Sequence, residues 1–437
     1  MKKPVSRRCL PFLLVCLLLF LCACQAPETA DIPDLEEEPQ IAEAIGTSVL
    51  PASEKKPKEP VIPAWQTQGS VSLDMGFLPS DAQDVHITLC AIGDVMAHNG
   101  TYEAAFDGTT YDFDYMFADI AKYVIDTDYS VGNLETVFAG KERVFSNYPA
   151  FNTPEQMGQS LAKVLGLDLL SLANNHIFDR GYAGLETTID FLDSFGISHT
   201  GAYTSQEAYD TPFIAEIGGA RVAFISATYG LNGAVPRDHP YAVRISSKES
   251  LSAASKAAVE AGADCVVALL HWGNEYENYA SKQQRELAGW LFENTAISLI
   301  IGNHAHVVQP IEVFDVEYEG HAKQGVCLYA LGNFTGEQLM QYRDGGILVR
   351  IGLDIRPGDP GAAQITQIEY TPTYIDSNPK PTGKRYRVIS IYDAIAGYES
   401  GSDPLISLAE YRKMLHYRDY YAELLTGSGL VREYAIE

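Results

Sequence analysis

Positively charged residues are scarce in this sequence. Its 437 residues include 31 Lys and Arg but 57 Asp and Glu, which gives a formal net charge of −26 at pH 7. Proteins bind nucleic acids largely by neutralising phosphates with Lys and Arg, so the deficit argues against nucleic acid as a partner. No internal repeat is evident.

Cysteine is also rare, with seven in the whole chain. The three beyond residue 24 are Cys90, Cys265 and Cys327, and each stands inside an apolar run that is typical of a strand. This pattern favours buried thiols over a disulfide framework or a zinc knuckle.

Long hydrophobic runs are few, and the clearest lies near the N-terminus. Four Lys and Arg residues precede the stretch LPFLLVCLLLFL, as in a secretory signal peptide. LCAC then resembles a bacterial lipoprotein signal, in which the last cysteine receives the lipid. A plain transmembrane anchor is the alternative, but the run is shorter than the ~20 apolar residues that a span needs. We therefore expect a signal peptide at 1–23, a lipid on Cys24 and a location on the extracytoplasmic face of the bacterial cell membrane.

A polar, proline-rich segment follows the signal region. Residues 24–84 include PDLEEEPQ and EKKPKEPVIP, in which Pro, Glu and Lys leave little apolar surface to bury. We expect this segment to be a disordered tether that holds the folded part away from the bilayer.

From His86 onward, short apolar runs alternate with stretches of helical spacing. HITLCAIG, DCVVALLH and SLIIG are examples of the runs, which are typical of buried strands. The alternation predicts an α/β domain over residues 85–375. The motifs cease after about Pro372, and the amphipathic stretch PLISLAEYRKMLHYRDYYAELL predicts a helical extension at 376–437 that packs on the same domain.

Polar residues follow the successive apolar runs instead of being scattered. Each could be an ordinary turn residue, helix cap or core histidine. In a sheet whose strands share a carboxyl edge, however, the loops converge on one rim, where ligands bind. His304 and His306 are two apart, so an extended loop would point both imidazoles the same way. A rim of carboxylate, amide and imidazole groups predicts a metal site, formed by Asp94, Glu135, Asn175, His176, His271, His304 and His306.

The order of these motifs resembles the calcineurin-like metallophosphoesterases and, more closely, the bacterial CapA family of capsule and poly-γ-glutamate synthesis proteins. The motifs span about Ile92 to Phe334 and read GDVM, GNLET, FNTPE, SLANNHIFDRG, HWGNEY, QRELA, GNHAHVVQPIE and YALGNF. The resemblance implies a four-layer α/β/β/α sandwich with two packed mixed sheets.

The resemblance also implies a centre for two divalent ions, either Mn, Fe or Zn. Hard carboxylate and amide oxygens together with imidazole suit these metals, and two neighbouring ions can hold both the attacking and the leaving oxygen of a displacement. The implied ligands are Glu135 as a bridge, then Asn175, His271 and His304 at one site, and Asp94 and His306 at the other.

The implied catalytic acid is His176. Asp179 would orient it, although Asp179 and Arg180 could equally form a surface ion pair of little energetic worth. Three further residues would line the cleft, namely Trp272, Glu275 and Tyr276. For Trp272, packing in the core is an equal alternative.

Two departures from the phosphoesterase pattern concern the metal ligands. Met96 stands where that pattern has a histidine, and a thioether binds hard ions poorly, so one site lacks an imidazole unless His98 reaches it. Glu135 replaces a shorter aspartate.

We expect a membrane-anchored, CapA-like protein that acts in the synthesis or export of an anionic capsule polymer of the poly-γ-glutamate type, beside membrane subunits of a polymer synthase. A divalent-metal phosphoesterase with a phosphoester substrate from the cell envelope is one alternative. A non-catalytic polymer-binding or assembly subunit is another. His176 favours catalysis, and Met96 favours binding.

Overall fold

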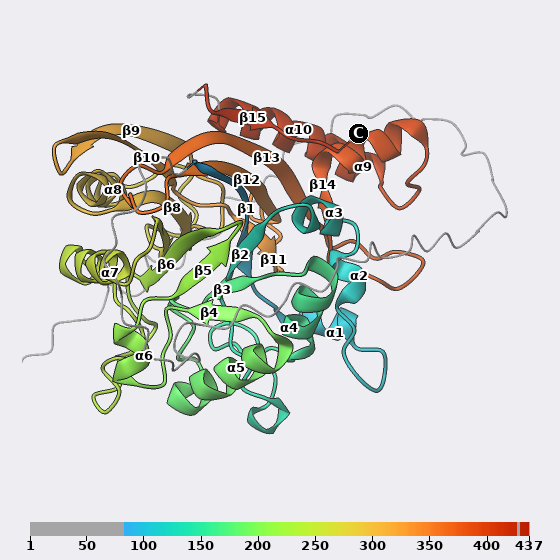
Figure 1. Cartoon of the computed structure of the whole chain (residues 1–437). Helices are drawn as coiled ribbons and strands as arrows, with labels where there is room; N and C mark the ends of the chain where they lie inside the picture. Colours follow the sequence, from blue (N-terminus) through green and yellow to red (C-terminus); the bar gives the residue numbers. More distant parts are fainter. Residues whose placement is uncertain (1–82, 426–428, 437) are drawn as a thin grey trace, which may run out of the picture. The chain divides into compact units, whose positions relative to one another are not determined.

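The computed structural model describes residues 83–425 and 429–436, which belong to one compact unit (Figure 1). The predicted signal peptide at 1–23, Cys24 and residues up to 82 of the predicted tether lie outside the described residues. Within the described ranges, no helix is long and apolar enough to cross a membrane.

The larger sheet has the spatial order β14-β13-β12-β1-β2-β3-β4, and the short strands β11 and β15 pair with β1 and β13. From β1 to β4 the strands are parallel, whereas β12, β13 and β14 continue the sheet in antiparallel fashion. The strands are β1 (Val85–Val95), β2 (Tyr129–Leu134), β3 (Leu169–Ser171), β4 (Ser198–Thr200), β11 (Asn333–Thr335), β12 (Gly345–Ile355), β13 (Gln364–Asp376), β14 (Arg387–Ser390) and β15 (Val431–Glu433).

The smaller sheet has the order β5-β6-β7-β8-β10-β9. Its central strands β6, β7, β8 and β10 are parallel, and the edge strands β5 and β9 are antiparallel to their neighbours. The strands are β5 (Ile214–Ile217), β6 (Ala220–Thr228), β7 (Cys265–His271), β8 (Ile297–Asn303), β9 (Ile311–Tyr318) and β10 (His321–Leu328).

Each sheet has one apolar face toward the other sheet and one toward helices. Along β1, Leu89 joins the core between the sheets and Cys90 packs on the opposite side. Along β7, Val267 joins the same central core and Leu270 packs on the outer side. Because side chains alternate along a strand, two inner and two outer faces produce four layers. The predicted α/β/β/α sandwich of two mixed sheets is thus confirmed.

Helices cover the outer face of each sheet (Figure 1). α7 and α8 lie on the smaller sheet, and α1 to α5 lie on the larger one. α8 begins at a capping box between Ser281 and Gln284, and α5 ends at Gly196, whose φ of 73° suits glycine. The helices are α1 (Asn99–Ala105), α2 (Asp114–Phe117), α3 (Ala121–Ile125), α4 (Gln156–Ser160), α5 (Gly181–Phe195), α6 (Gln206–Asp210), α7 (Lys248–Glu260) and α8 (Lys282–Asn294), with short 3₁₀ and π turns at Lys141–Arg143 and Leu161–Leu165.

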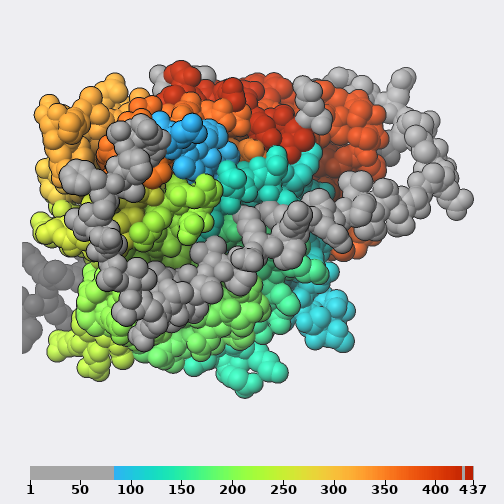
Figure 2. All heavy atoms as spheres, in the orientation of Figure 1, coloured from blue at the N-terminus to red at the C-terminus, as the bar shows by residue number. Residues whose placement is uncertain are grey.

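The C-terminal segment joins the central core. α9 (Ile391–Ser400) and α10 (Leu408–Leu425) pack against β13, and Met414 and Tyr421 of α10 are fully buried. The hydroxyl of Tyr417 donates to Oδ1 of Asp344 at 2.6 Å. The same segment also supplies β14 and β15 to the larger sheet. On the face shown in Figure 2, its red atoms adjoin the orange atoms of the preceding strands.

The three cysteines behave as the sequence predicts. Cys90, Cys265 and Cys327 are each at most 1% exposed, within β1, β7 and β10. They are therefore part of the packing of both sheets.

Candidate metal centre

The predicted site residues converge where the carboxyl ends of parallel strands from both sheets meet. Asp94 lies near the end of β1, Glu135 directly follows β2, and His271 ends β7 in the other sheet. All seven predicted residues are at most 5% exposed, namely Asp94, Glu135, Asn175, His176, His271, His304 and His306. The loops therefore bring the seven together, as their places after the strands indicate.

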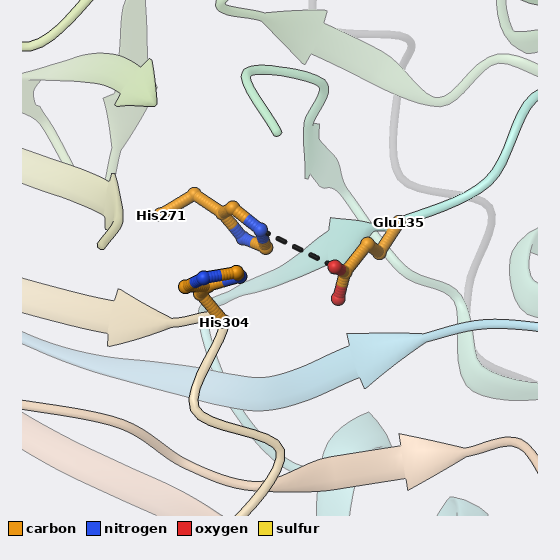
Figure 3. A group of neighbouring side chains, drawn as sticks. All are labelled: Glu135, His271 and His304. Carbon is orange, nitrogen blue, oxygen red and sulfur yellow. Dashed lines mark ion pairs between the residues drawn. The ribbon is translucent and has the colours of Figure 1, made fainter. Parts of the chain in front are cut away.

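Two groups of potential ligands share Glu135. One consists of Glu135, His271 and His304, and the other of Asp94, Glu135 and His306; within each group the ligand atoms lie within 4.8 Å of one another. Figure 3 shows the first group, whose imidazoles and carboxylate point toward each other, with Nε2 of His271 3.3 Å from Oε1 of Glu135.

Asn175 lies beside the first group, because its Oδ1 is 2.8 Å from Nε2 of His271. The six predicted ligands thus lie together, with Glu135 shared by the two groups. Their role as ligands stays a prediction.

The loop that carries His304 and His306 is not extended, which corrects our expectation. Both residues have positive φ, at 94° and 55°, and the N–H of His304 donates to Oδ2 of Asp94 at 3.2 Å. The tight turn separates the ring centroids by 6.1 Å. Each imidazole consequently belongs to a different group, instead of both facing one point.

The strongest sign of a cation is the state of Glu135. The residue is completely buried, yet neither carboxylate oxygen accepts a hydrogen bond from the described residues, and Nδ1 of the buried His304 is also without a partner there. Oε1 of Glu135 lies 3.3 Å from Nε2 of His271 and 3.8 Å from Nε2 of His306, and neither contact is a hydrogen bond. A buried carboxylate without hydrogen bonds is expected to be paired or to coordinate a metal. Carboxylate oxygens with imidazole nitrogens fit Mn, Fe or Zn.

Electrostatics within the centre separates the histidines into two kinds. Burial lowers the pKa of His271 and of His304 to about 3, so both rings are neutral and offer a lone pair to an ion. Burial also acts to lower the pKa of His306, but the carboxylates of Glu135 and Asp94 outweigh it and raise that pKa to about 9. Burial and the charge of Asp94 raise the pKa of Glu135 well above its usual value.

Asn133 supports the centre from β2, and the sequence reading missed it. Its Nδ2 donates to Oδ1 of Asp94 at 2.7 Å and lies 3.3 Å from Nδ1 of His271. It thus links a carboxylate of one group to an imidazole of the other. Its place in the motif GNLET, two residues before Glu135, is the sequence feature that could have identified it.

Asn333 supports His306 in a similar way and was also missed. Its Nδ2 donates to the carbonyl of Arg343 at 2.7 Å and lies 3.3 Å from Oε1 of Gln338. The amide oxygen is therefore the atom 3.0 Å from Nδ1 of His306. This contact holds a proton on Nδ1 and leaves Nε2 of His306 for a metal.

His176 and Asp179 form a buried pair. Nδ1 of His176 lies 2.6 Å from Oδ2 of Asp179, and the side chains are 6% and 5% exposed. Arg180 does not pair with this carboxylate, since its guanidinium donates to the Asp179 and Ala150 carbonyls at 2.9 Å. The alternative of a surface ion pair between Asp179 and Arg180 is thus wrong.

The remaining candidates divide between cleft and core. Trp272 is 3% exposed and donates its Nε1 to the Tyr329 carbonyl at 3.0 Å, so it packs in the outer core and does not line a cleft. Tyr276 is 39% exposed, with its ring centroid 5.8 Å from that of His306.

Met96 is buried at 1% exposure. His98, whose Nδ1 accepts the Glu337 N–H at 3.1 Å, belongs to neither ligand group among the described residues. It does not replace the missing imidazole at Met96.

Two mixed sheets between helices, with a carboxylate and imidazole centre at their shared edge, define an α/β/β/α sandwich protein with a candidate metal centre. The sequence profile of the family described as bacterial capsule synthesis protein PGA_cap matches residues 88–338. The chain belongs to this family.

Relatives of known name agree with this assignment. The capsule biosynthesis protein CapA of Bacillus anthracis is 29% identical over 296 residues, which cover 63% of this chain and 69% of that protein. The PGA biosynthesis protein CapA of Bacillus subtilis (strain 168) is 27% identical over 262 residues, 59% of this chain and 64% of the relative. A probable polyglutamine synthesis accessory protein of Mycobacterium tuberculosis is 25% identical over 199 residues, 43% of this chain and 52% of the relative.

The solved structures that match this chain have low sequence identity to it. The 5′-nucleotidase precursor of Thermus thermophilus is 15% identical with a TM-score of 0.41, over 78% of this chain and 59% of that one. The calcineurin-like phosphoesterase YfkN of Bacillus subtilis is 15% identical with a TM-score of 0.40, over 78% of this chain and 98% of that one.

Proposed function

We propose that this protein is a metal-dependent PGA_cap protein that acts in the synthesis or export of an anionic capsule polymer of the poly-γ-glutamate type. Family membership and the names of the relatives support the process. The observation that carries the metal dependence is Glu135, a fully buried carboxylate without hydrogen bonds that two ligand groups share.

The site residues suggest how such a centre would work. Asp94, Glu135, Asn175, His271, His304 and His306 would hold two divalent ions, which would supply Lewis-acid stabilisation of charge that develops on a substrate oxygen. His176, positioned by Asp179, would donate a proton to the leaving group. Burial of the whole set limits access of water and strengthens each electrostatic contact.

The second candidate function is a phosphoesterase that acts on cell-envelope substrates, which the buried His176–Asp179 pair favours. A non-catalytic polymer-binding subunit is favoured by Met96 in place of a ligand. One experiment separates the phosphoesterase from the other two. We would purify the protein without chelator, measure bound divalent metal and assay hydrolysis of an aryl phosphate.

We expect bound metal in this experiment. Metal together with aryl phosphate hydrolysis supports the phosphoesterase, and metal without it supports action on the polymer. No retained Mn, Fe or Zn after incubation with each ion would refute the metal-dependent proposal.

The location is part of the proposal. A lipid on Cys24 would place the protein on the extracytoplasmic face of the membrane, close to membrane subunits of a polymer synthase. The LCAC sequence and the apolar run before it support this anchor. Cys24→Ala should release the protein from the membrane fraction, and full retention of that variant would contradict the lipid anchor.

A further inference from the structure

Arg343 is a cation near the metal centre that has no acidic partner among the described residues. It is half-buried, and its guanidinium carbon lies 3.5 Å from the centre of the Tyr276 ring. The hydrogen bond of its guanidinium is a weak one, from Nη1 to Sδ of Met340 at 3.4 Å. Other cations nearby are engaged; Lys413, for example, pairs with Asp344. In a chain of net charge −26, an uncommitted guanidinium at this place needs an explanation.

Tyr276 fixes the guanidinium relative to the centre. Its backbone N–H donates to the Ala305 carbonyl at 2.7 Å, in the turn between the two loop histidines. Its ring contacts both Arg343 and His306, with the ring centroids of Tyr276 and His306 5.8 Å apart. Tyr276 has φ of 67°, and non-glycine residues in this strained region cluster at active sites and ligand clamps.

Asn333 contacts both His306 and the backbone of Arg343. One side chain contacts Nδ1 of His306 through its oxygen and the backbone carbonyl of Arg343 through its nitrogen. The position of Arg343 is therefore coupled to an imidazole of the candidate metal centre. The family profile ends at residue 338, so it does not include Arg343.

We propose that Arg343, held flat on Tyr276, binds a second anionic group of a polymer whose first anionic group lies at the metal centre. This inference rests on the proposed function and adds a residue outside the metal centre that recognises the polymer. A guanidinium stacked on a ring keeps its N–H edge free, and that edge matches a carboxylate in bidentate fashion. A substrate with one anionic group could fill the centre alone, whereas a polyanion would reach Arg343 as well. The site thus selects for a repeated negative charge.

The test uses the metal-loaded protein and poly-γ-glutamate oligomers, with glutamate monomer and polyphosphate as comparison ligands. Binding would be measured by calorimetry for the wild type, Arg343→Gln, Arg343→Lys and Tyr276→Leu. Arg412→Gln is the matched control, because Arg412 is an exposed residue on α10 and loses the same charge.

We expect Arg343→Gln to weaken oligomer binding about tenfold, as for one lost charge-assisted contact, without changing metal content. Arg343→Lys should recover part of the affinity, since it restores the charge but not the planar fork. Tyr276→Leu should weaken oligomer binding less than Arg343→Gln does. Arg412→Gln should bind as the wild type does.

Equal affinities for Arg343→Gln and Arg412→Gln would overturn the inference. Binding of polyphosphate alone, or of neither polymer, would also overturn it. Metal content separates this failure from failure of the proposed function. If wild type and Arg343→Gln both retain metal, the metal-dependent proposal stands even when Arg343 proves irrelevant to the polymer.

Discussion

Nδ1 of His176 lies 2.6 Å from Oδ2 of Asp179, and the same carboxylate oxygen accepts the backbone N–H of Phe151 at 2.6 Å. Asp179 is therefore fixed from two sides and in turn fixes the imidazole. Nε2 of His176, which lies 3.4 Å from Nδ2 of Asn232, is the nitrogen that would deliver a proton to a substrate. This pair is the part of the site that can be tested apart from the metal ligands.

Removal of the proton donor should affect turnover and not metal binding. For His176→Ala we expect hydrolysis of any accepted ester to fall about 10²–10⁴-fold, because a general acid contributes on that order. For Asp179→Asn we expect a loss of about 10–100-fold, as for other groups that orient a reacting side chain. Metal content and turnover would be measured together. Asp190→Asn, on the exposed side of α5, is the control, and a His176→Ala enzyme of normal activity would remove His176 from the mechanism.

Each loop histidine should control one ion. His304 belongs to the group with Glu135 and His271, and His306 to the group with Asp94 and Glu135. His304→Ala and His306→Ala should therefore each lose about one divalent ion per chain, and the double variant both. Elemental analysis after dialysis gives the stoichiometry. Unchanged metal in the double variant would return both residues to the status of ordinary loop histidines.

Replacement of Glu135 should abolish metal binding at both sites and yet stabilise the metal-free protein. Glu135→Leu removes a buried carboxyl group whose oxygens accept no hydrogen bond, so the free energy of unfolding without metal should rise by about 1–3 kcal/mol. Denaturant titrations in the presence of chelator would measure it. A metal-free variant less stable than the metal-free wild type would show that the carboxyl group has partners in solution.

Metal affinity should increase with pH. His306, whose pKa is raised to about 9 by Glu135 and Asp94 against the effect of burial, must lose its proton to bind an ion. The pKa of Glu135 is also raised, by burial and by Asp94, so its proton must leave too. Each released proton makes the association constant rise about tenfold per pH unit until the pH passes that group's pKa.

The stability of the metal-free protein should show the opposite trend. Above about pH 7, His271 and His304 are neutral in both the folded and the unfolded state and no longer contribute. The pKa values of His306 and Glu135 are higher in the folded state, so the stability they contribute, full below their unfolded pKa values, is lost as the pH rises through the folded ones, about 9 for His306. Calorimetric titration of Mn²⁺ and thermal unfolding with chelator, each from pH 6 to 9, would measure the two trends. A metal affinity that does not change over this range would contradict the protonation states.

The sequence could predict those features that are encoded within a few residues. Short continuous apolar runs such as that around Val267 predict strands that are buried on both faces. Residues placed directly after such runs, for example Glu135 and His271, are expected at a strand end wherever the strand lies. The α/β class and the seven buried residues of the centre could therefore be predicted. β14 and β15, of four and three residues, are too short to leave a periodic pattern.

The tertiary structure alone decided which of these groups meet. His304 donates to Asp94, 210 residues earlier, and Asn333 contacts His306 across 27 residues, because two sheets pack through their apolar faces and bring their strand ends to one edge. The turn that points His304 and His306 to different groups, and the stack of Arg343 on Tyr276, depend on that packing as well. Periodicity is a property of neighbours in the chain, whereas the convergence of side chains depends on strand order and on how the layers pack. The sequence by itself thus determined the kinds of candidate ligand and the strands that carry them, and the packed layers determined their partners.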